Sequence, residues 1–177
     1  MRTANGVPKY YGKYRGTVIN NIDPMFQGRL LVEVPDVLTV VPSSWAVPCV
    51  PLAGPTGPPM GVYMVPPIGA GVWIEFEQGD PANPIWVGCR WGGPSDVPPL
   101  ARLGLPISPS IVLQTAGQNS IAISDLPGPT GGIMLKSLTG AMILVNDLGI
   151  TISNGKGATI VMMGPTVTIN QGALVIT

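Results

Sequence analysis

The sequence has 177 residues, only 10% of them charged, and its formal net charge is zero. Soluble domains carry about 25% charged residues, so the low charge and the mean hydropathy of +0.38 predict a surface largely buried against partners. A membrane-spanning helix needs roughly 20 consecutive apolar residues, and prolines interrupt the long uncharged stretch 37–74 too often for one. The 24 glycines and 21 prolines disfavour long helices and predict an almost entirely β structure.

The N-terminal residues 1–12 form a polar arm, either disordered or docked on a partner, without the apolar core of a signal peptide. Strands are predicted at Tyr14–Asn20 and Arg29–Val34. A third strand, Trp45–Pro51, has prolines at its margins and is therefore expected at a sheet edge. A loop rich in glycine and proline follows at Leu52–Met60.

Two further strands and the turn between them carry the clearest pattern of the N-terminal half. Every second residue from Val72 to Phe76 is apolar, which predicts one buried face. The turn follows because Gly79 can adopt a positive φ and Pro81 cannot continue a central strand. A last strand is predicted at Pro84–Arg90, which completes a closed sheet of five or six strands.

The spacing of nine residues in this region resembles the OB-type domain of phage baseplate assembly protein V and of VgrG spikes. In that family a proline–glycine turn leads into a strand that ends in a phenylalanine–glutamate pair, and a glycine–aspartate–proline turn precedes the last barrel strand. The resemblance covers about Lys13–Gly92 and implies an OB barrel there. The residues that carry it, which we expect to shape the barrel and its rim, are Pro66, Gly69, Phe76, Glu77, Gly79, Asp80, Pro81, Pro84 and Gly88.

Residues 93–109 are rich in glycine and proline and predict a linker. From Ser110 onward, apolar pairs spaced by two residues recur about every seven to twelve residues, with turn residues between them. This period suits one strand plus one turn. The aliphatic residues predicted to point inward and to pack around a trimer axis are Ile121, Ile123, Ile133, Leu135, Met142, Leu144, Ile150, Ile152, Ile160, Met162, Val167, Ile169, Leu174 and Ile176.

Both faces of this repeat region, 110–177, are partly apolar. Ile143, Val145, Val161, Met163 and Val175 are assigned to the face opposite the inward set. A monomer would expose apolar surface and a long unpaired strand edge, which favours aggregation. Three copies wound around one axis would bury the inward side chains and pair each strand edge with the next chain, so we expect a homotrimer.

The resemblance implies the same assembly, because in that family a triple-stranded β-helix needle follows the barrel. The predicted fold class is all-β, with an N-terminal OB-fold barrel at 13–92 and an intertwined trimeric β-helix at 110–177. The resemblance also implies a trimeric hub protein at the barrel and a PAAR-type tip protein at the C-terminal end. The sequence departs from some relatives in lacking a lysozyme segment, the hub domain of VgrG, and the histidines that hold iron at some spike tips.

Other functions of an OB barrel are less well supported by the residues present. Binding of single-stranded nucleic acid needs a basic groove with exposed aromatic side chains. The basic residues in the barrel region are Lys13, Arg15, Arg29 and Arg90, and the chain is neutral. We therefore expect no nucleic acid partner.

The residues that could act in catalysis or bind a metal are expected to have structural roles instead. Histidine is absent, which removes the commonest general base. Cys49 and Cys89 lie in apolar strand patterns and are expected to be inert, buried thiols rather than a disulfide or a redox pair, and no feature of the sequence fixes the distance between them. Glu75 and Glu77 are assigned to one strand face, and Asp80 to a turn, so we expect no catalytic residue, metal or cofactor.

Larger apolar residues are interpreted in the same way. The adjacent pair Met162-Met163 could bind a soft metal, but core packing is the expected role. Three tryptophans of the barrel region, Trp73, Trp86 and Trp91, are expected to pack in the core and between subunits.

The resemblance, together with the expected trimeric repeat region, implies the central spike of a contractile injection machine such as a phage tail or tailocin. The protein would be assembled in the cytoplasm into a particle, and sheath contraction would drive the spike into the target envelope with transient membrane contact. No enzyme is predicted, because no nucleophile–base pair is recognisable. The alternative is an oligomeric OB-fold adaptor that binds carbohydrate or nucleic acid.

Overall fold

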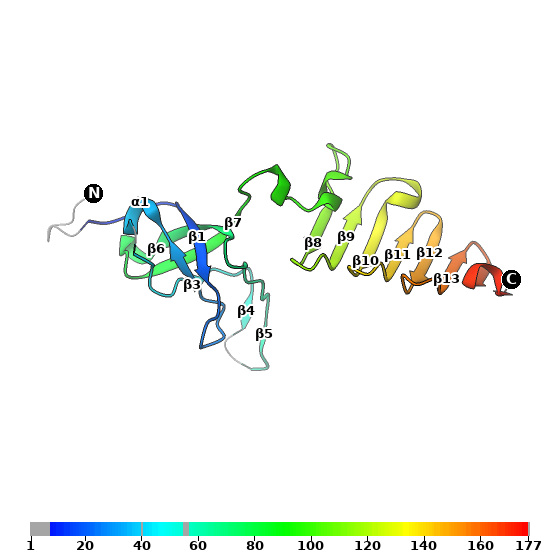
Figure 1. Cartoon of the computed structure of the whole chain (residues 1–177), viewed down its shortest axis with the longest axis horizontal. Coiled ribbons are helices and arrows are strands. Elements are labelled where there is room, and N and C mark those ends of the chain that lie inside the picture. The colour runs from blue at the N-terminus through cyan, green and yellow to red at the C-terminus, as the bar shows by residue number, and fades with distance from the viewer. Residues whose placement is uncertain (1–7, 40, 55–56, 177) are drawn as a thin grey trace. The chain divides into compact units, whose positions relative to one another are not determined.

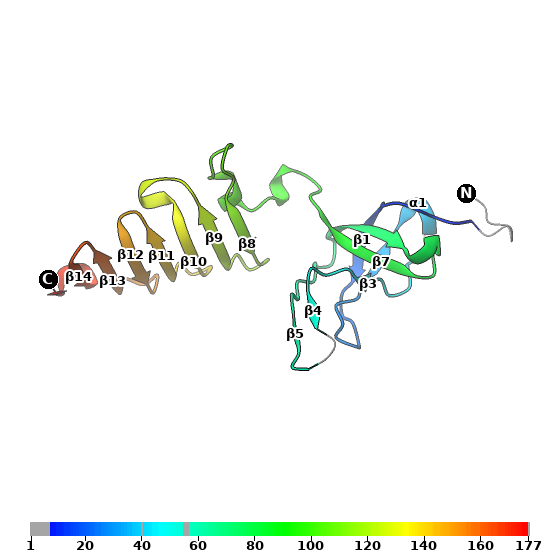
Figure 2. The ribbon, with the colours of Figure 1, turned by 180° about the vertical axis from the view of Figure 1, so that it is seen from behind.

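The computed structural model describes residues 8–39, 41–54 and 57–176, and the chain divides into two compact units, Met1–Gly92 and Gly93–Thr177 (Figures 1 and 2). The all-β prediction is confirmed, with only short helical turns between strands. None of the helices in the described residues is long and apolar enough to cross a membrane.

The strands are β1 (Tyr14–Asn20), β2 (Leu31–Glu33), β3 (Val47–Pro48), β4 (Ala53–Gly54), β5 (Met60–Gly61), β6 (Gly71–Phe76), β7 (Pro84–Arg90), β8 (Ile111–Gln114), β9 (Ser120–Ser124), β10 (Gly132–Lys136), β11 (Met142–Asn146), β12 (Gly149–Ser153), β13 (Thr159–Met163), β14 (Thr166–Ile169) and β15 (Leu174–Ile176). The helical turns are α1 (Pro35–Leu38), η1 (Glu77–Gly79), η2 (Pro94–Asp96), η3 (Pro99–Arg102), η4 (Gly128–Thr130) and η5 (Asn170–Gly172).

The N-terminal unit is a curled five-stranded sheet in the order β2-β1-β6-β7-β3. Its two ends meet, because the Leu30 amide donates to the Ala46 carbonyl at 3.1 Å and the Ala46 amide donates back at 2.7 Å. A closed or partly open sheet of five strands is the architecture of an OB fold. The third strand, β3, has the predicted end position in the strand order, beside β7, and the Leu30–Ala46 pairing joins this end to the β2 end.

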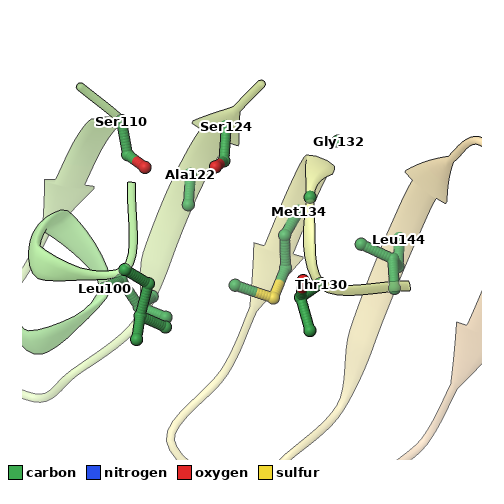
Figure 3. A pocket seen from close by; sticks show the side chains of 10 residues that line it. Leu100, Ser110, Ala122, Ser124, Thr130, Gly132, Met134 and Leu144 are labelled. Atoms are coloured by element: carbon green, nitrogen blue, oxygen red, sulfur yellow. The ribbon is translucent and has the colours of Figure 1, made fainter. Parts of the chain in front are cut away.

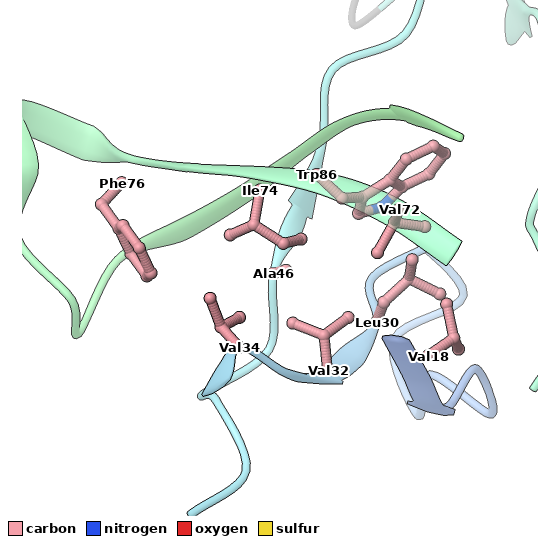
Figure 4. Close-up of a cluster of buried hydrophobic side chains, with 9 residues drawn as sticks. All are labelled: Val18, Leu30, Val32, Val34, Ala46, Val72, Ile74, Phe76 and Trp86. Atoms are coloured by element: carbon pink, nitrogen blue, oxygen red, sulfur yellow. The ribbon is translucent and has the colours of Figure 1, made fainter. Parts of the chain in front are cut away.

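The core of the barrel consists of inward side chains from β1, β2, β6 and β7 and from the segments beside β2 and β3 (Figure 4). Burial alternates along β6 as the sequence predicts, with Val72, Ile74 and Phe76 buried. The indole Nε1 of Trp86 donates to the Gly28 carbonyl at 3.0 Å, which satisfies a polar group that burial would otherwise leave unpaired. The core members are Val18, Leu30, Val32, Val34, Ala46, Val72, Ile74, Phe76 and Trp86.

The described part of the N-terminal arm packs on its own barrel. The Tyr10 amide donates to the Gly79 carbonyl at 2.9 Å, and the Tyr10 ring lies 6.3 Å from that of Phe76. The Tyr14 ring completes the group, 5.6 Å from Phe76. Most of the predicted arm, residues 1–7, lies outside the described residues.

The C-terminal unit is an eight-stranded antiparallel sheet in which β8 to β15 pair in chain order (Figure 1). Short turns produce this meander; β11 and β12, for example, are joined by a two-residue loop in which the Asn146 side chain accepts the Leu148 amide at 3.0 Å. Gly149, at φ 142°, begins β12 where a Cβ atom would lie 1.9 Å from the Met162 carbonyl oxygen.

The strand pairing differs from the predicted winding in one respect. We expected each strand edge to pair with the next chain, yet β9 to β14 pair on both sides with neighbours in the same chain. The reason is that the turns are short enough for consecutive strands to form hairpins. Within this sheet only β8 and β15 occupy end positions.

The segment predicted to be a linker has its own local structure. The turns η2 and η3 fall within residues 93–109, and the Arg102 guanidinium donates to the carbonyls of Pro94 and Val97. A bridge between Leu105 and Ser108 closes a further turn, and the Ser108 hydroxyl bonds the Asp125 carboxylate.

A candidate association face on the C-terminal sheet

Two continuous rows of aliphatic side chains cross one face of the C-terminal sheet. Residues directly opposite each other in an antiparallel pair lie on the same face, and the register places two aliphatic residues of every strand opposite two of the next. One row is Leu113, Ile121, Leu135, Ile143, Ile152, Ile160, Ile169 and Leu174. The second row is Ile111, Ile123, Ile133, Val145, Ile150, Met162, Val167 and Ile176.

The register corrects the predicted inward set in β11. Twelve of the fourteen predicted residues share the two-row face, but the placement of Met142 and Leu144 with them is wrong. Ile143 pairs with Leu135 and Ile152, so Ile143 and Val145 occupy the rows instead. The physical reason is that Met142 to Val145 are four consecutive apolar residues. Without alternating polar positions, the sequence does not show which two of them share a face with the aliphatic residues of the neighbouring strands.

The two-row face is open to solvent in the single chain. Twelve of its sixteen side chains are exposed and the other four are half-buried. An exposed apolar surface of this extent on a soluble protein marks an interaction site. The arrangement is therefore suited to association through this face.

The opposite face of the sheet is partly covered by the chain itself. Leu100 and Leu103 of the η3 region lie beside Ala122, Met134 and Leu144 around a cavity of about 30 Å³ (Figure 3). A second hollow near Leu148 and Val161 measures about 130 Å³. Ligand pockets are about 300–1,000 Å³, so these two hollows reflect packing rather than small-molecule binding.

Two protein families match the chain in sequence. Residues 14–91 match the Type VI secretion system/phage-baseplate injector OB domain, and residues 110–175 match the phage baseplate V C-terminal trimerisation domain. The matches span 78 and 66 residues, 144 of the 177 in all. The chain belongs to the baseplate V family of spike proteins. No curated protein matches it.

The family assignment gives this baseplate V chain a structural role in an injector particle, a phage or a type VI secretion system. Both matched families are structural baseplate domains rather than enzymes. All of the two-row face except Ile176 lies within the matched trimerisation domain. The component is accordingly one that is assembled into a phage or injection particle.

The predicted motif residues of the baseplate V barrel occupy turns and strand ends. Gly79 is buried at φ 73° in the β6–β7 turn, where the Asp80 amide donates to the Glu77 carbonyl at 2.9 Å. The Asp80 carboxylate accepts the Ala82 amide at 3.0 Å. Pro81 lies in this same turn.

The remaining motif residues flank β6 and β7. The Pro66 carbonyl accepts the Asn21 side chain at 3.0 Å, and the Gly69 amide donates to Val18. Phe76 pairs with Pro84, which begins β7. Gly88, at φ 152°, lies at a register shift in β7.

Several side chains singled out in the sequence have partners within the barrel. Lys13 forms an ion pair with Glu75, and Arg29 with Asp23. Arg90 donates to the Gly16 carbonyl at 3.5 Å. Three of the four basic residues that a nucleic-acid groove would require are therefore engaged with the barrel itself.

The expectation of buried thiols is wrong, because both cysteines are free and exposed. Cys49 follows β3, which is only two residues long, and Cys89 lies near the end of β7 beyond a register shift. Partial burial raises the pKa of the Cys89 thiol. Apolar neighbours in the sequence did not guarantee burial at the ends of these strands.

Other residues with possible chemical roles are spread apart. Trp86 is buried as predicted, whereas Trp73 is half-buried and Trp91 is exposed. Met162 lies in the second row and Met163 on the opposite face, so their sulfur atoms do not converge. Among the described residues, no group of three or more Cys, Asp or Glu side chains could hold a metal ion.

Proposed function

We infer that this chain is the central spike of a contractile injection machine, with three copies associated through their two-row faces. The observation that carries the inference is the pair of aliphatic rows, open to solvent and lying in a segment matched to a trimerisation domain. Three flat sheets facing inward would form a three-sided prism with an apolar interior. The apolar faces would then be removed from water, which stabilises the assembly.

The mechanism of such a spike is mechanical. Eight strands spaced about 4.8 Å apart give each sheet a length of roughly 34 Å. Every interior strand is hydrogen-bonded on both sides, so axial force is distributed over the whole ladder. Contraction of a sheath would drive this stiff body through the target envelope with transient membrane contact.

The two ends of the chain suit different partners in this proposal. The barrel would attach to a trimeric hub protein, as in the family that it resembles. Within the part of the chain that the structure describes, the end strand β15 has a neighbouring strand on one side only, and exposed strand edges are usually covered. A tip protein of the PAAR type would cover the C-terminal end.

The native mass of the purified chain tests the assembly. Light scattering should give about three times the chain mass of 18.4 kDa, which is 55.2 kDa. The trimer should persist through moderate heat and detergent, because separation requires the three apolar faces to part together. A stable 18.4 kDa monomer with an unaggregated sheet would exclude the proposal.

Puncture requires a separate test in assembled particles. Particles carrying a spike with a disrupted two-row face should assemble poorly or fail to permeabilise target cells, as measured by uptake of an impermeant dye. Particles that lack trimeric spike yet still permeabilise cells would contradict the proposed role.

A further inference from the structure

A second exposed apolar surface lies on the N-terminal barrel, where two connections are side by side. One joins β1 to β2 and the other joins β5 to β6, and residues of the two connections contact each other. The Asn21 side chain donates to the Pro66 carbonyl, and a side chain at Gly28 would lie 3.4 Å from the Tyr63 ring. We call this surface the barrel patch; its exposed members are Ile22, Met25, Phe26, Tyr63 and Met64.

The barrel patch is unusually open for apolar side chains. Phe26 is 86% exposed, Ile22 76% and Tyr63 69%. Single exposed apolar residues are normal, but a group on adjoining loops marks a site of protein contact. Loops of this kind on a rigid barrel commonly carry binding functions.

The first loop of the patch is held rigidly. The side chain of Asp23 is only 2% exposed and accepts the amides of Met25, Gln27 and Arg29 at 3.0, 2.8 and 3.2 Å. The Arg29 guanidinium adds two hydrogen bonds at 3.0 and 2.6 Å. The Arg29 hydrogen bond, reinforced by these amides, holds the pKa of Asp23 well below its usual range.

This network presents Phe26 in a conformation that is uncommon for a bulky residue. Its φ is 54°, in the left-handed region, and its amide donates to the Asp23 carbonyl at 3.0 Å. Such conformations cost free energy and persist where the surrounding structure fixes them. The loop therefore holds an aromatic side chain in solvent against both strain and the hydrophobic effect.

The barrel patch is uncharged, and this excludes partners that are recognised through basic residues. No charged residue occurs from 37 to 74, and the only charge between 20 and 28 is Asp23, which Arg29 neutralises. Nucleic acids and anionic membranes are recognised through basic residues, which this patch lacks. An uncharged surface can, however, approach identical copies of itself without repulsion.

We propose that the barrel patch is a contact between barrels of neighbouring copies of this chain. The proposal rests on the trimer inferred above. Residues 91–110 join each barrel to the C-terminal sheet, so association of three sheets holds three barrels near one another, and short linkers give effective concentrations of about millimolar. A patch too weak to join free barrels is occupied under that confinement.

Photo-crosslinking of the full chain tests this contact directly. The photoreactive residue p-benzoylphenylalanine is introduced as Phe26→p-benzoylphenylalanine, in purified protein whose native mass is measured first. The matched control replaces Tyr11, an exposed aromatic residue that packs near Gly79 rather than in the patch. Irradiation at position 26 should give covalent dimers and trimers of the chain at about tenfold the yield of the control.

The possible results distinguish failure of the proposed barrel contact from failure of the inferred trimer. A native mass of 55.2 kDa with no crosslinks above the control would overturn the barrel contact and leave the spike inference intact. A native mass of 18.4 kDa would overturn both. Crosslinks to a different polypeptide that form only in assembled particles would assign the patch to another baseplate component and also overturn the proposal.

A second variant tests whether the rigid loop serves the contact. Asp23→Asn removes the carboxylate that orders the loop while leaving Phe26 in place, and should lower the crosslink yield at position 26 several-fold. Hydrogen exchange over residues 22–28 should rise in the same variant, with native mass unchanged. Undiminished crosslinking with a loosened loop would show that the contact does not need Asp23 to present Phe26, and would overturn that part of the proposal.

Discussion

The barrel and the C-terminal sheet use aliphatic side chains in different ways. In the barrel, Val72 and Ile74 point into a core that the chain itself closes through the Leu30–Ala46 pair. In the C-terminal sheet, one face is lined by two aliphatic rows and remains exposed. The barrel can therefore fold by burying surface within one chain, whereas the sheet has surface to bury only against another.

This difference between the two units accounts for the low charge and high mean hydropathy of the whole chain. A low charge and a high mean hydropathy describe the chain as a whole, yet they do not indicate where apolar surface remains open. The register of the C-terminal sheet locates that surface. Folding of the barrel core should consequently depend little on protein concentration, while the stability of the sheet should depend on assembly.

The largest expected effect comes from a charge in the middle of the two-row face. Ile152→Asp would bury three carboxylates near one another in the trimer, and unpaired buried charges are strongly unfavourable. We expect the native mass to fall from 55.2 kDa to 18.4 kDa, or the protein to aggregate, as measured by light scattering.

The neighbouring residue supplies a matched control for this change. Thr151 lies on the same strand but faces the other way, so Thr151→Asp should leave the trimer intact. Loss of the trimer in the Thr151 variant and its survival in the Ile152 variant would reverse our assignment of the faces.

A smaller effect is expected when the barrel core is truncated. Ile74 is fully buried, and Ile74→Ala should destabilise the barrel by about 2–5 kcal/mol. Denaturant unfolding followed by tryptophan fluorescence should show this loss to the same extent at different protein concentrations. The exposed Val47 provides the control, since Val47→Ala should change stability by less than about 0.5 kcal/mol. Dissociation of the trimer by the Ile74 variant would argue that the units are not independent.

The assignment of faces in β11 can be tested at two adjacent residues. Ile143→Ser removes an aliphatic side chain from the first row and should cost about 1.5–3 kcal/mol per chain. Met142→Ser alters the opposite face and should cost less than about 1 kcal/mol. Thermal unfolding of the trimer should therefore occur at a lower temperature for the Ile143 variant; equal or inverted effects would favour the inward placement of Met142 that the sequence predicts.

The β11 residues also show what the sequence could and could not determine. In β6, alternating residues give the correct buried face, because polar and apolar positions differ. In β11, Met142 to Val145 are all apolar, so the phase comes only from pairing with β10 and β12. The barrel motif was likewise recognisable from its turns, since glycine and proline constrain the backbone locally.

The barrel patch could not be predicted in the same way, because its residues come from two loops far apart in the sequence. Ile22, Met25 and Phe26 lie between the predicted strands Tyr14–Asn20 and Arg29–Val34, and Tyr63 and Met64 follow the loop predicted at Leu52–Met60. The nearby Asp23 and Arg29 offered one signal, a carboxylate six residues before an arginine in a loop with few other charges. Only the fold reveals that this pair is buried and that the two loops adjoin.

The smallest expected effect concerns pH and the same carboxylate. Since the folded pKa of Asp23 is below its unfolded value of about 3.9, ionised Asp23 stabilises the barrel above that pH, and this contribution is lost as pH falls toward the folded pKa. The difference in unfolding free energy between wild type and Asp23→Asn should be constant from about pH 5 to 7 and shrink below about pH 4. Asp36→Asn, at an exposed carboxylate at the start of α1, is the control and should produce a much smaller change. A difference at Asp23 that did not vary with pH would mean that packing of the loop, rather than the charge of its buried carboxylate, holds Phe26 in place.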